Sequence, residues 1–153
     1  NLEVIPTKIM PLIASEVAKW QKLNPSRAIT FEASTELNEQ LVTIDIRRIQ
    51  QVLAILCDNA IKYSKSDQPI DISLHRTDLL ITIAIKDYGE GISAAEVDNI
   101  FERFVRFSKH SEGLGLGLPI AKAIIEAHDG SISVTSTQGQ GSIFSISLPV
   151  GHK

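Results

Sequence analysis

The sequence predicts an α+β fold, a two-layer sandwich in which one sheet is covered by three main helices. Three observations lead to this prediction. The chain has 153 residues, which suits one domain spanning 1–153. Segments with helical spacing of apolar residues are interspersed with short runs in which apolar and polar residues alternate. Several of these runs follow one another closely enough to form antiparallel hairpins.

The most regular segment is a helix predicted over residues 46–64. Its apolar stripe recurs at three- and four-residue steps and consists of Ile46, Ile49, Leu53, Leu56 and Ala60. Asp45 precedes the helix and is predicted to be its N-cap. Near the helix end, Asn59, Lys62 and Tyr63 share one side, which favours a ligand-binding edge. A solvated flank of a helix would show the same pattern.

The other elements follow from the same periodicities. Helices are predicted over residues 7–23, 93–100 and 119–128, and strands over residues 28–33, 41–44, 70–75, 79–86, 131–136 and 142–148. Ser93 and Glu96 have the spacing of a capping box. Pro119 suits the first turn of the last helix, and Gly130 suits its end.

Composition narrows the classes of function. A net charge of −3 and a pI near 5.8 argue against nucleic acid as the main partner. No apolar run reaches the length of a membrane span. The single cysteine, Cys57, is expected to be a buried apolar side chain in a reducing compartment. The chain starts at Asn1 without an initiator Met, so we expect a fragment of a longer protein.

Two glycine clusters mark candidate ligand-binding loops. The first spans residues 87–91, and its Asp87 lies at the end of an apolar strand, where a carboxylate can accept a hydrogen bond from an amine such as that of adenine. The second spans residues 113–118 and leads into a helix, an arrangement that favours phosphate. A plain turn and a flexible linker are the alternatives. The second cluster is neither a Walker loop nor a dinucleotide fingerprint, because the lysine and the spacing those motifs need are missing.

An irregular aromatic and basic segment, residues 100–107, separates the two clusters. Its phenylalanines could anchor a lid, and its arginines could meet phosphate. A helix end packed in the core is the alternative.

In their order and spacing, these four signals resemble the N, G1, F and G2 boxes of the catalytic and ATP-binding domain of sensor histidine kinases. The resemblance covers nearly the whole chain and includes residues 120–136 and 139–149. That family belongs to the GHKL superfamily, which has the Bergerat nucleotide-binding fold with an ATP lid.

The resemblance implies a role for individual residues. Asn59 corresponds to the Mg²⁺ ligand that bridges the ATP phosphates, Lys62 to a phosphate contact, and Tyr63 to the ring against adenine. Asp87 corresponds to the aspartate that binds the adenine amine, and Arg106 to a lid arginine at the terminal phosphate. Arg103 is the weaker candidate for that arginine. The implied catalytic residues are Asn59, Lys62 and Arg106. Further implied nucleotide contacts are Gly89, Gly91, Ile92, Gly113, Leu114, Gly115, Leu116, Gly117 and Leu118.

Ile55 departs from the family pattern one turn before Asn59. Many histidine kinases have a second asparagine there, and hydrolytic members of the superfamily have a glutamate that activates water. Isoleucine cannot act as a general base, so inefficient ATP hydrolysis is expected. The same loss of a polar side chain puts the water network around the metal in doubt. A second departure is Leu114, where a small hydroxyl residue is common.

The resemblance implies that the domain binds Mg·ATP and donates the γ-phosphate to a histidine on a separate dimerisation domain of the same parent. A response regulator would be an indirect partner, and the domain would lie in the cytoplasm, with membrane anchoring of the parent left open. The phosphoacceptor histidine is not expected in this chain. Of its four histidines, only His128 precedes an acidic residue, and its predicted role is helix termination. The others are His75, His110 and His152.

Three alternatives remain open at this point. The first is a gyrase-like or chaperone-like ATPase, which Ile55 and the short lid disfavour. The second is a pseudokinase or interaction module, which the joint presence of Asn59, Asp87 and the G2 glycines disfavours. The third is a serine kinase of the anti-sigma-factor type, which would use a glutamate in the N box.

Overall fold

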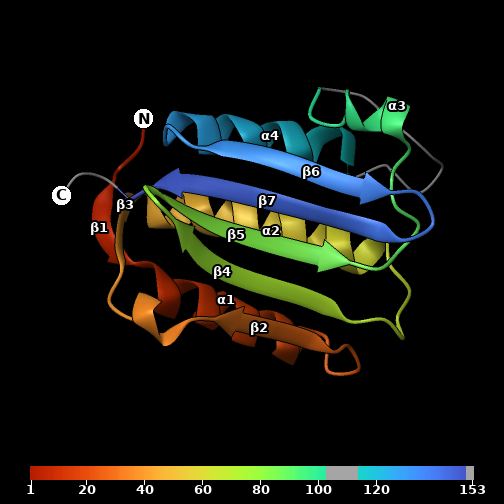
Figure 1. Cartoon of the computed structure of the whole chain (residues 1–153), viewed down its shortest axis with the longest axis horizontal. Helices are drawn as coiled ribbons and strands as arrows, with labels where there is room; N and C mark the ends of the chain where they lie inside the picture. The colour runs from red at the N-terminus through yellow and green to blue at the C-terminus, as the bar shows by residue number, and fades with distance from the viewer. Residues whose placement is uncertain (103–113, 151–153) are drawn as a thin grey trace.

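Alternating apolar residues build a five-stranded mixed sheet with the strand order β2-β4-β5-β7-β6 (Figure 1). A computed structural model describes residues 1–102 and 114–150 of the chain, and only the backbone of residues 114–116. The strands are β2 (Ile29–Ala33), β4 (Ile70–Thr77), β5 (Leu80–Asp87), β6 (Ser131–Thr137) and β7 (Gly141–Pro149). Strand β2 runs parallel to β4, and the other pairs are antiparallel. This confirms the predicted α+β class.

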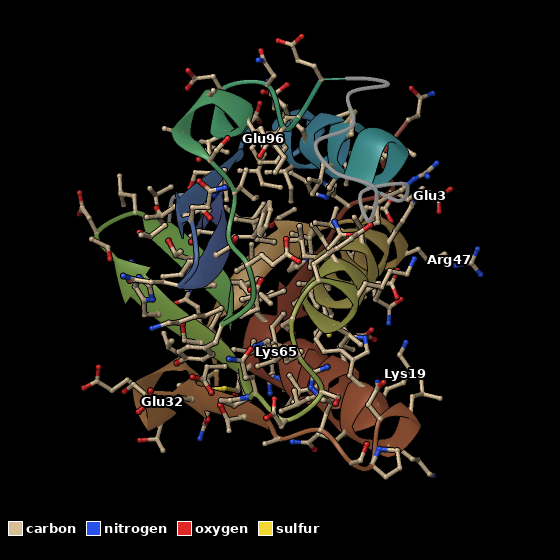
Figure 2. The ribbon with its side chains drawn as sticks, turned by 90° about the vertical axis from the view of Figure 1, so that its right-hand side faces the viewer. Glu3, Lys19, Glu32, Arg47, Lys65 and Glu96 are labelled. Atoms are coloured by element: carbon tan, nitrogen blue, oxygen red, sulfur yellow. The ribbon has the colours of Figure 1, made fainter. Side chains whose placement is uncertain are left out.

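Three long helices cover one face of this sheet: α1 (Ile9–Leu23), α2 (Ile46–Lys62) and α4 (Leu114–Ala127). Every second residue of the central strands points into this layer, and Ile72, Ile83 and Ile146 are all almost completely buried there. Figure 2 shows the two layers from the side. Glu32 of β2 points away on the sheet side, while Lys19 of α1 and Arg47 of α2 point away on the helix side.

Strand β3 (Leu41–Ile44) does not join the main sheet. It pairs antiparallel with β1 (Ile5–Lys8), a strand that the sequence did not predict. Thr7 and Lys8, expected in the first helix, lie opposite Val42 and Leu41. The backbone pairing therefore outcompetes the helical pattern at these two residues, and α1 begins at Ile9. The short elements η1 (Thr35–Leu37) and α3 (Ala94–Val97) complete the fold.

Helix α4 begins at Leu114, five residues before the expected start at Pro119. A proline at this position cannot donate the hydrogen bond to the carbonyl oxygen four residues earlier, and its ring crowds that oxygen. That carbonyl belongs to Gly115, in the first turn of the helix, so the rest of the hydrogen-bond ladder is left in place. Gly115 and Gly117 therefore lie inside the helix rather than in a loop that precedes it.

The predicted caps are present. The carboxylate of Asp45 accepts a hydrogen bond from the main-chain N–H of Arg48 at 3.2 Å. Ser93 and Glu96 form the expected capping box at the start of α3. Within residues 1–102 and 114–150, none of the helices combines the length and apolarity needed to cross a bilayer.

Candidate functional site

A cavity of about 530 Å³ lies at the end of the sheet where β5 ends. The C-terminal turn of α2, the short helix α3 and the turn between β6 and β7 surround it. Figure 1 shows these elements at the end of the molecule opposite the N-terminus and the end of β7. The lining residues are Asn59, Tyr63, Asp87, Glu90, Gly91, Ile92, Ser93, Glu96, Gln138, Gly139, Ser142 and Phe144. The structure thus brings the predicted residues Asn59, Tyr63, Asp87, Gly91 and Ile92 to one cavity.

Asn59 reaches the cavity from α2, where it lies on the edge of the apolar stripe. Its side chain is 6% exposed, and its Nδ2 atom has no hydrogen-bond partner among the described residues. A buried amide without a partner is costly, and a bound ligand would satisfy it. A half-turn of the amide about its terminal torsion brings Oδ1 to the same place, where it would suit a hard cation such as Mg²⁺.

Asp87 is the last residue of β5 and is 7% exposed. Its Oδ1 atom accepts a hydrogen bond from the main-chain N–H of Gly89 at 2.9 Å. Burial raises the pKa of this carboxyl group, and hydrogen bonds from the backbone of Gly89 and Ser142 partly oppose that shift. A carboxylate has about four lone-pair sites, so with these two hydrogen bonds it can still accept another from a ligand amine.

The loop after Asp87 lies directly against the end of α2. A Cβ atom added to Gly89 would lie 2.2 Å from the carbonyl oxygen of Tyr63. Gly91 has a φ of +75°, and a Cβ atom there would lie 2.3 Å from the carbonyl oxygen of Thr137. Glycine at these two positions therefore lets the loop touch α2 on one side and β6 on the other.

Arg27 holds the end of α2 from outside the cavity, and the sequence did not single it out. Its guanidinium donates to the carbonyl oxygens of Ile61 at 3.3 Å and Gln68 at 3.1 Å, and to the hydroxyl group of Ser64. These contacts fix the last turn of α2 and the loop after it. Tyr63, which lies between these partners in the chain, is held with them.

The wall opposite α2 comes from α3. The Ser93 hydroxyl caps the main-chain N–H of Glu96 at 3.3 Å, and the Glu96 carboxylate accepts from that hydroxyl at 3.1 Å. Figure 2 shows Glu96 where α3 lies close to α4. Ile92 is fixed by a hydrogen bond of 2.7 Å from its main-chain N–H to the Ser136 hydroxyl.

Other predicted site residues lie elsewhere. Lys62 forms an ion pair with Asp58 at 3.3 Å and, with Gly89, borders a neighbouring cavity of about 430 Å³. Leu118 is fully buried in the core. Gly115 and Gly117 lie in the first turns of α4 with Leu114 and Leu116, whose side chains are not described. Arg103, Arg106 and Gly113 lie outside the described residues.

Several lining residues were not predicted from the sequence. They are Glu90, Ser93, Glu96, Gln138, Gly139, Ser142 and Phe144. Ser142 shows why. It lies directly opposite Asp87 across the β5–β7 pair, and this register appears only once the strands are placed. The turn containing Gly139 and Gly141 was the one local signal for this side of the cavity.

His128 is unsuited to accept a phosphoryl group. It is 8% exposed, and its Nε2 atom accepts a hydrogen bond from the main-chain N–H of Asp45 at 3.0 Å. Its Nδ1 atom lies 2.8 Å from the carbonyl oxygen of Ile124. Both ring nitrogens are therefore occupied. His75 is exposed on β4, and His110 and His152 lie outside the described residues.

Known proteins match this chain over most of its length. Residues 44–152 match the family described as histidine kinase-, DNA gyrase B-, and HSP90-like ATPase. The adaptive-response sensory kinase SasA of Synechococcus sp. (strain JA-3-3Ab) is 34% identical over 98% of this chain and 41% of that protein. The alginate biosynthesis sensor protein KinB of Pseudomonas aeruginosa is 32% identical over 98% of this chain and 25% of that protein. The chain thus spans less than half the length of these relatives.

Solved structures show the same fold. The catalytic domain of histidine kinase ThkA superposes with a TM-score of 0.85 at 24% identity, over 97% of this chain and 96% of that one. Full-length ShkA in complex with AMPPNP superposes with a TM-score of 0.83 at 25% identity, over 97% of this chain and 31% of that one.

Proposed function

Since the chain belongs to the family of histidine kinase-, DNA gyrase B- and HSP90-like ATPases, we propose that it binds Mg·ATP and donates the γ-phosphate to a histidine on a separate domain. The observation that carries this proposal is that Asn59 and Asp87 are both buried and border one cavity, and that Nδ2 of Asn59 has no hydrogen-bond partner among the described residues. ATP binding and a role in two-component signalling agree with the family and with the sensor kinases among the relatives.

The proposed binding mode uses both ends of the cavity. Asp87 would accept the exocyclic amine of adenine, and Tyr63 would pack against the ring. Asn59 would hold Mg²⁺ with its amide oxygen; the ion, when bound, would neutralise phosphate charge. The unpartnered amide of Asn59 supports this assignment. Among the described residues no cluster of three acidic, histidine or cysteine side chains could hold a metal ion, so most other ligands would be water and phosphate.

Positively charged side chains and free main-chain N–H groups would bind the nucleotide phosphates. The first turn of α4 has main-chain N–H groups without helical partners, which favours anions. Lys62 and Arg106 are the proposed cationic contacts. Phosphoryl transfer needs positioning and charge neutralisation rather than covalent chemistry from the protein, so these groups would suffice.

Ile55 bears on whether the γ-phosphate is transferred to a protein or to water. It lies one turn before Asn59 on α2 and has no group that could remove a proton from water. We therefore propose that the bound γ-phosphate is kept for a histidine acceptor. The acceptor would lie on a dimerisation domain of the parent protein, and a response regulator would follow it. On this proposal the domain works in the cytoplasm, whether or not the parent is anchored in a membrane.

Calorimetric titration of the 153-residue chain with Mg·ATP tests the site. The wild type should bind, and Asn59→Asp and Asp87→Asn should each lose at least about tenfold in affinity. Asn59→Asp puts a negative charge beside the phosphates, and Asp87→Asn replaces the charged acceptor of the adenine amine by a neutral amide. Equal binding by all three proteins would show that the site is wrongly assigned. A second measurement, steady-state phosphate release, should be close to background. Robust turnover would favour the ATPase alternative instead.

A further inference from the structure

Ile55 lies against Gly117, at the point where α2 and α4 approach each other. A Cβ atom added to Gly117 would lie 3.1 Å from Cγ2 of Ile55, closer than an ordinary van der Waals contact. Apart from the adjoining backbone, no other described atom lies within 4 Å of that point. The methyl group of Ile55 therefore occupies the side-chain space that Gly117 leaves free.

This contact lies between two parts of the proposed ATP site. Asn59 follows Ile55 by one turn of α2, so the two side chains lie on adjacent turns of the same helix edge. Gly117 lies in the first turns of α4, close to its free main-chain N–H groups. The distance between α2 and α4 here determines how far the amide of Asn59 lies from those N–H groups.

An isoleucine side chain is suited to hold α2 and α4 at a fixed distance. Its β-branched side chain has one strongly preferred χ1 rotamer in a helix, so Cγ2 is a rigid contact point. Ile55 is partly buried and packs against the hydrophobic core, which restrains it further. Glycine on the facing helix lets the backbone come close, as at other tight helix contacts.

We propose that Ile55 is a positioning residue that seats the first turns of α4 against α2 and so sets the space for the nucleotide phosphates. The contact is one of packing, and Gly117 is its required counterpart. This proposal rests on the ATP site proposed above. It assigns no contact between Ile55 and the nucleotide, because Ile55 acts through the placement of α4.

A double-mutant cycle tests the pairing. Calorimetric titrations with Mg·ATP and, separately, with adenosine are compared for the wild type, Gly117→Ala, Ile55→Ala and the double variant. In Gly117→Ala the added methyl group should push α4 away and weaken Mg·ATP binding about tenfold. Adenosine binding should stay unchanged, because the nucleoside uses the Asp87 end of the cavity. The double variant should recover Mg·ATP affinity to within about threefold of the wild type.

Ile61→Ala is the matched control. Ile61 is also a partly buried isoleucine of α2, and like Ile55 it borders the groove beside Trp20 and Leu23 of α1. Unlike Ile55, it has no atom within 4 Å of a Cβ atom added to Gly117. Combined with Gly117→Ala, Ile61→Ala should not restore the Mg·ATP affinity. The proposal is overturned if Ile55→Ala gives no recovery, if Ile61→Ala recovers as much, or if Gly117→Ala weakens adenosine and Mg·ATP equally.

Two further outcomes are informative. If Gly117→Ala does not fold, thermal unfolding of the double variant decides: a restored transition supports the pairing, and a missing one overturns it. If the wild type binds neither adenosine nor Mg·ATP, the proposed function itself fails. If the wild type binds both and the cycle shows no coupling, only the positioning role of Ile55 fails.

Discussion

Asp45 and His128 join the two helices of the site at the end remote from the cavity. The main-chain N–H of Asp45 donates to Nε2 of His128 at 3.0 Å, while Nδ1 of the same ring binds the carbonyl oxygen of Ile124. The imidazole is therefore neutral, with its proton on Nδ1. The carboxylate of Asp45 accepts the main-chain N–H of Glu3 at 2.9 Å, and this hydrogen bond lowers the pKa of the carboxyl group. These hydrogen bonds thus connect the residues that precede β1 and α2 to the residue that follows α4.

Replacing His128 should cost stability and leave nucleotide binding intact. His128→Ala removes the partner of a buried N–H group, so the free energy of unfolding should fall by about 1–3 kcal/mol in urea denaturation. His75→Ala, at an exposed position of β4, should change it by less than about 0.5 kcal/mol. If His128→Ala were as stable as His75→Ala, the joining role would be wrong.

Asp87 should make the free domain less stable as the pH rises. Burial raises its pKa above the ordinary value of 3.8, so the folded chain keeps a proton that the unfolded chain has already lost. The ionised carboxylate therefore costs stability at neutral pH, and this cost disappears as the pH falls through the raised pKa towards 3.8.

The variant Asp87→Asn tests this sign. Without nucleotide it should unfold at a higher urea concentration than the wild type at pH 7, and the difference should shrink towards pH 4, about the ordinary pKa of the group. The same variant should lose Mg·ATP affinity. Asp67→Asn, at an exposed position, is the control and should show no such pH-dependent difference. A wild type more stable than Asp87→Asn at neutral pH would contradict the prediction.

Arg27 should support nucleotide binding from outside the cavity. Arg27→Met keeps much of the apolar stem but removes the hydrogen bonds to Ile61, Ser64 and Gln68, and should lower the free energy of unfolding by about 2 kcal/mol. The end of α2 would loosen, so Mg·ATP affinity should fall at temperatures where the variant is still fully folded. Arg27→Lys should recover part of both losses, since it restores the charge near the helix carbonyls. Undiminished affinity in Arg27→Met would exclude this role.

Gly91 and Gly139 both have a positive φ, but they differ in whether an added Cβ atom would also meet neighbouring atoms. Gly91 and Gly139 have φ values of +75° and +88°, but a Cβ atom meets the backbone of Thr137 at Gly91 and nothing within 4 Å at Gly139. Gly139→Ala should therefore cost about 1–2 kcal/mol of folding stability, the cost of a left-handed alanine alone. Gly91→Ala should cost clearly more and reduce the nucleotide affinity. If both variants lost the same free energy of unfolding in chemical denaturation, the backbone at Thr137 would have to move away from the added methyl group at little cost.

Local signals in the sequence predicted much of the fold and part of the site. The stripe of α2, the Asp45 cap and the capping box of α3 each depend on residues within a few positions of one another, and all three were correct. The position of Asp87 at a strand end was predicted by the apolar run before it. Helix geometry placed Asn59, Lys62 and Tyr63 on one side of α2, and the resemblance to the histidine kinase family singled out Asn59 among them.

The missed features depend on contacts between distant segments. Strand β1 forms only because β3 pairs with it, and Ser142 lies beside Asp87 only because of the β5–β7 register. Arg27 binds backbone groups more than thirty residues away, with no pattern in the chain to indicate it. Helix α4 starts five residues before Pro119, so the preference of proline for the first turn of a helix placed the predicted start too late.

The capping box of α3 has a consequence for how the cavity can be observed. This helix has four residues and none of them is buried, so its hydrogen bonds are held mainly by Ser93 and Glu96 rather than by packing. Amide protons in such a turn exchange with solvent through brief local opening, far faster than those of the central strands. Because Ile92, Ser93 and Glu96 also line the cavity, slowed deuterium uptake in this segment would report ligand binding without a mutation or a label.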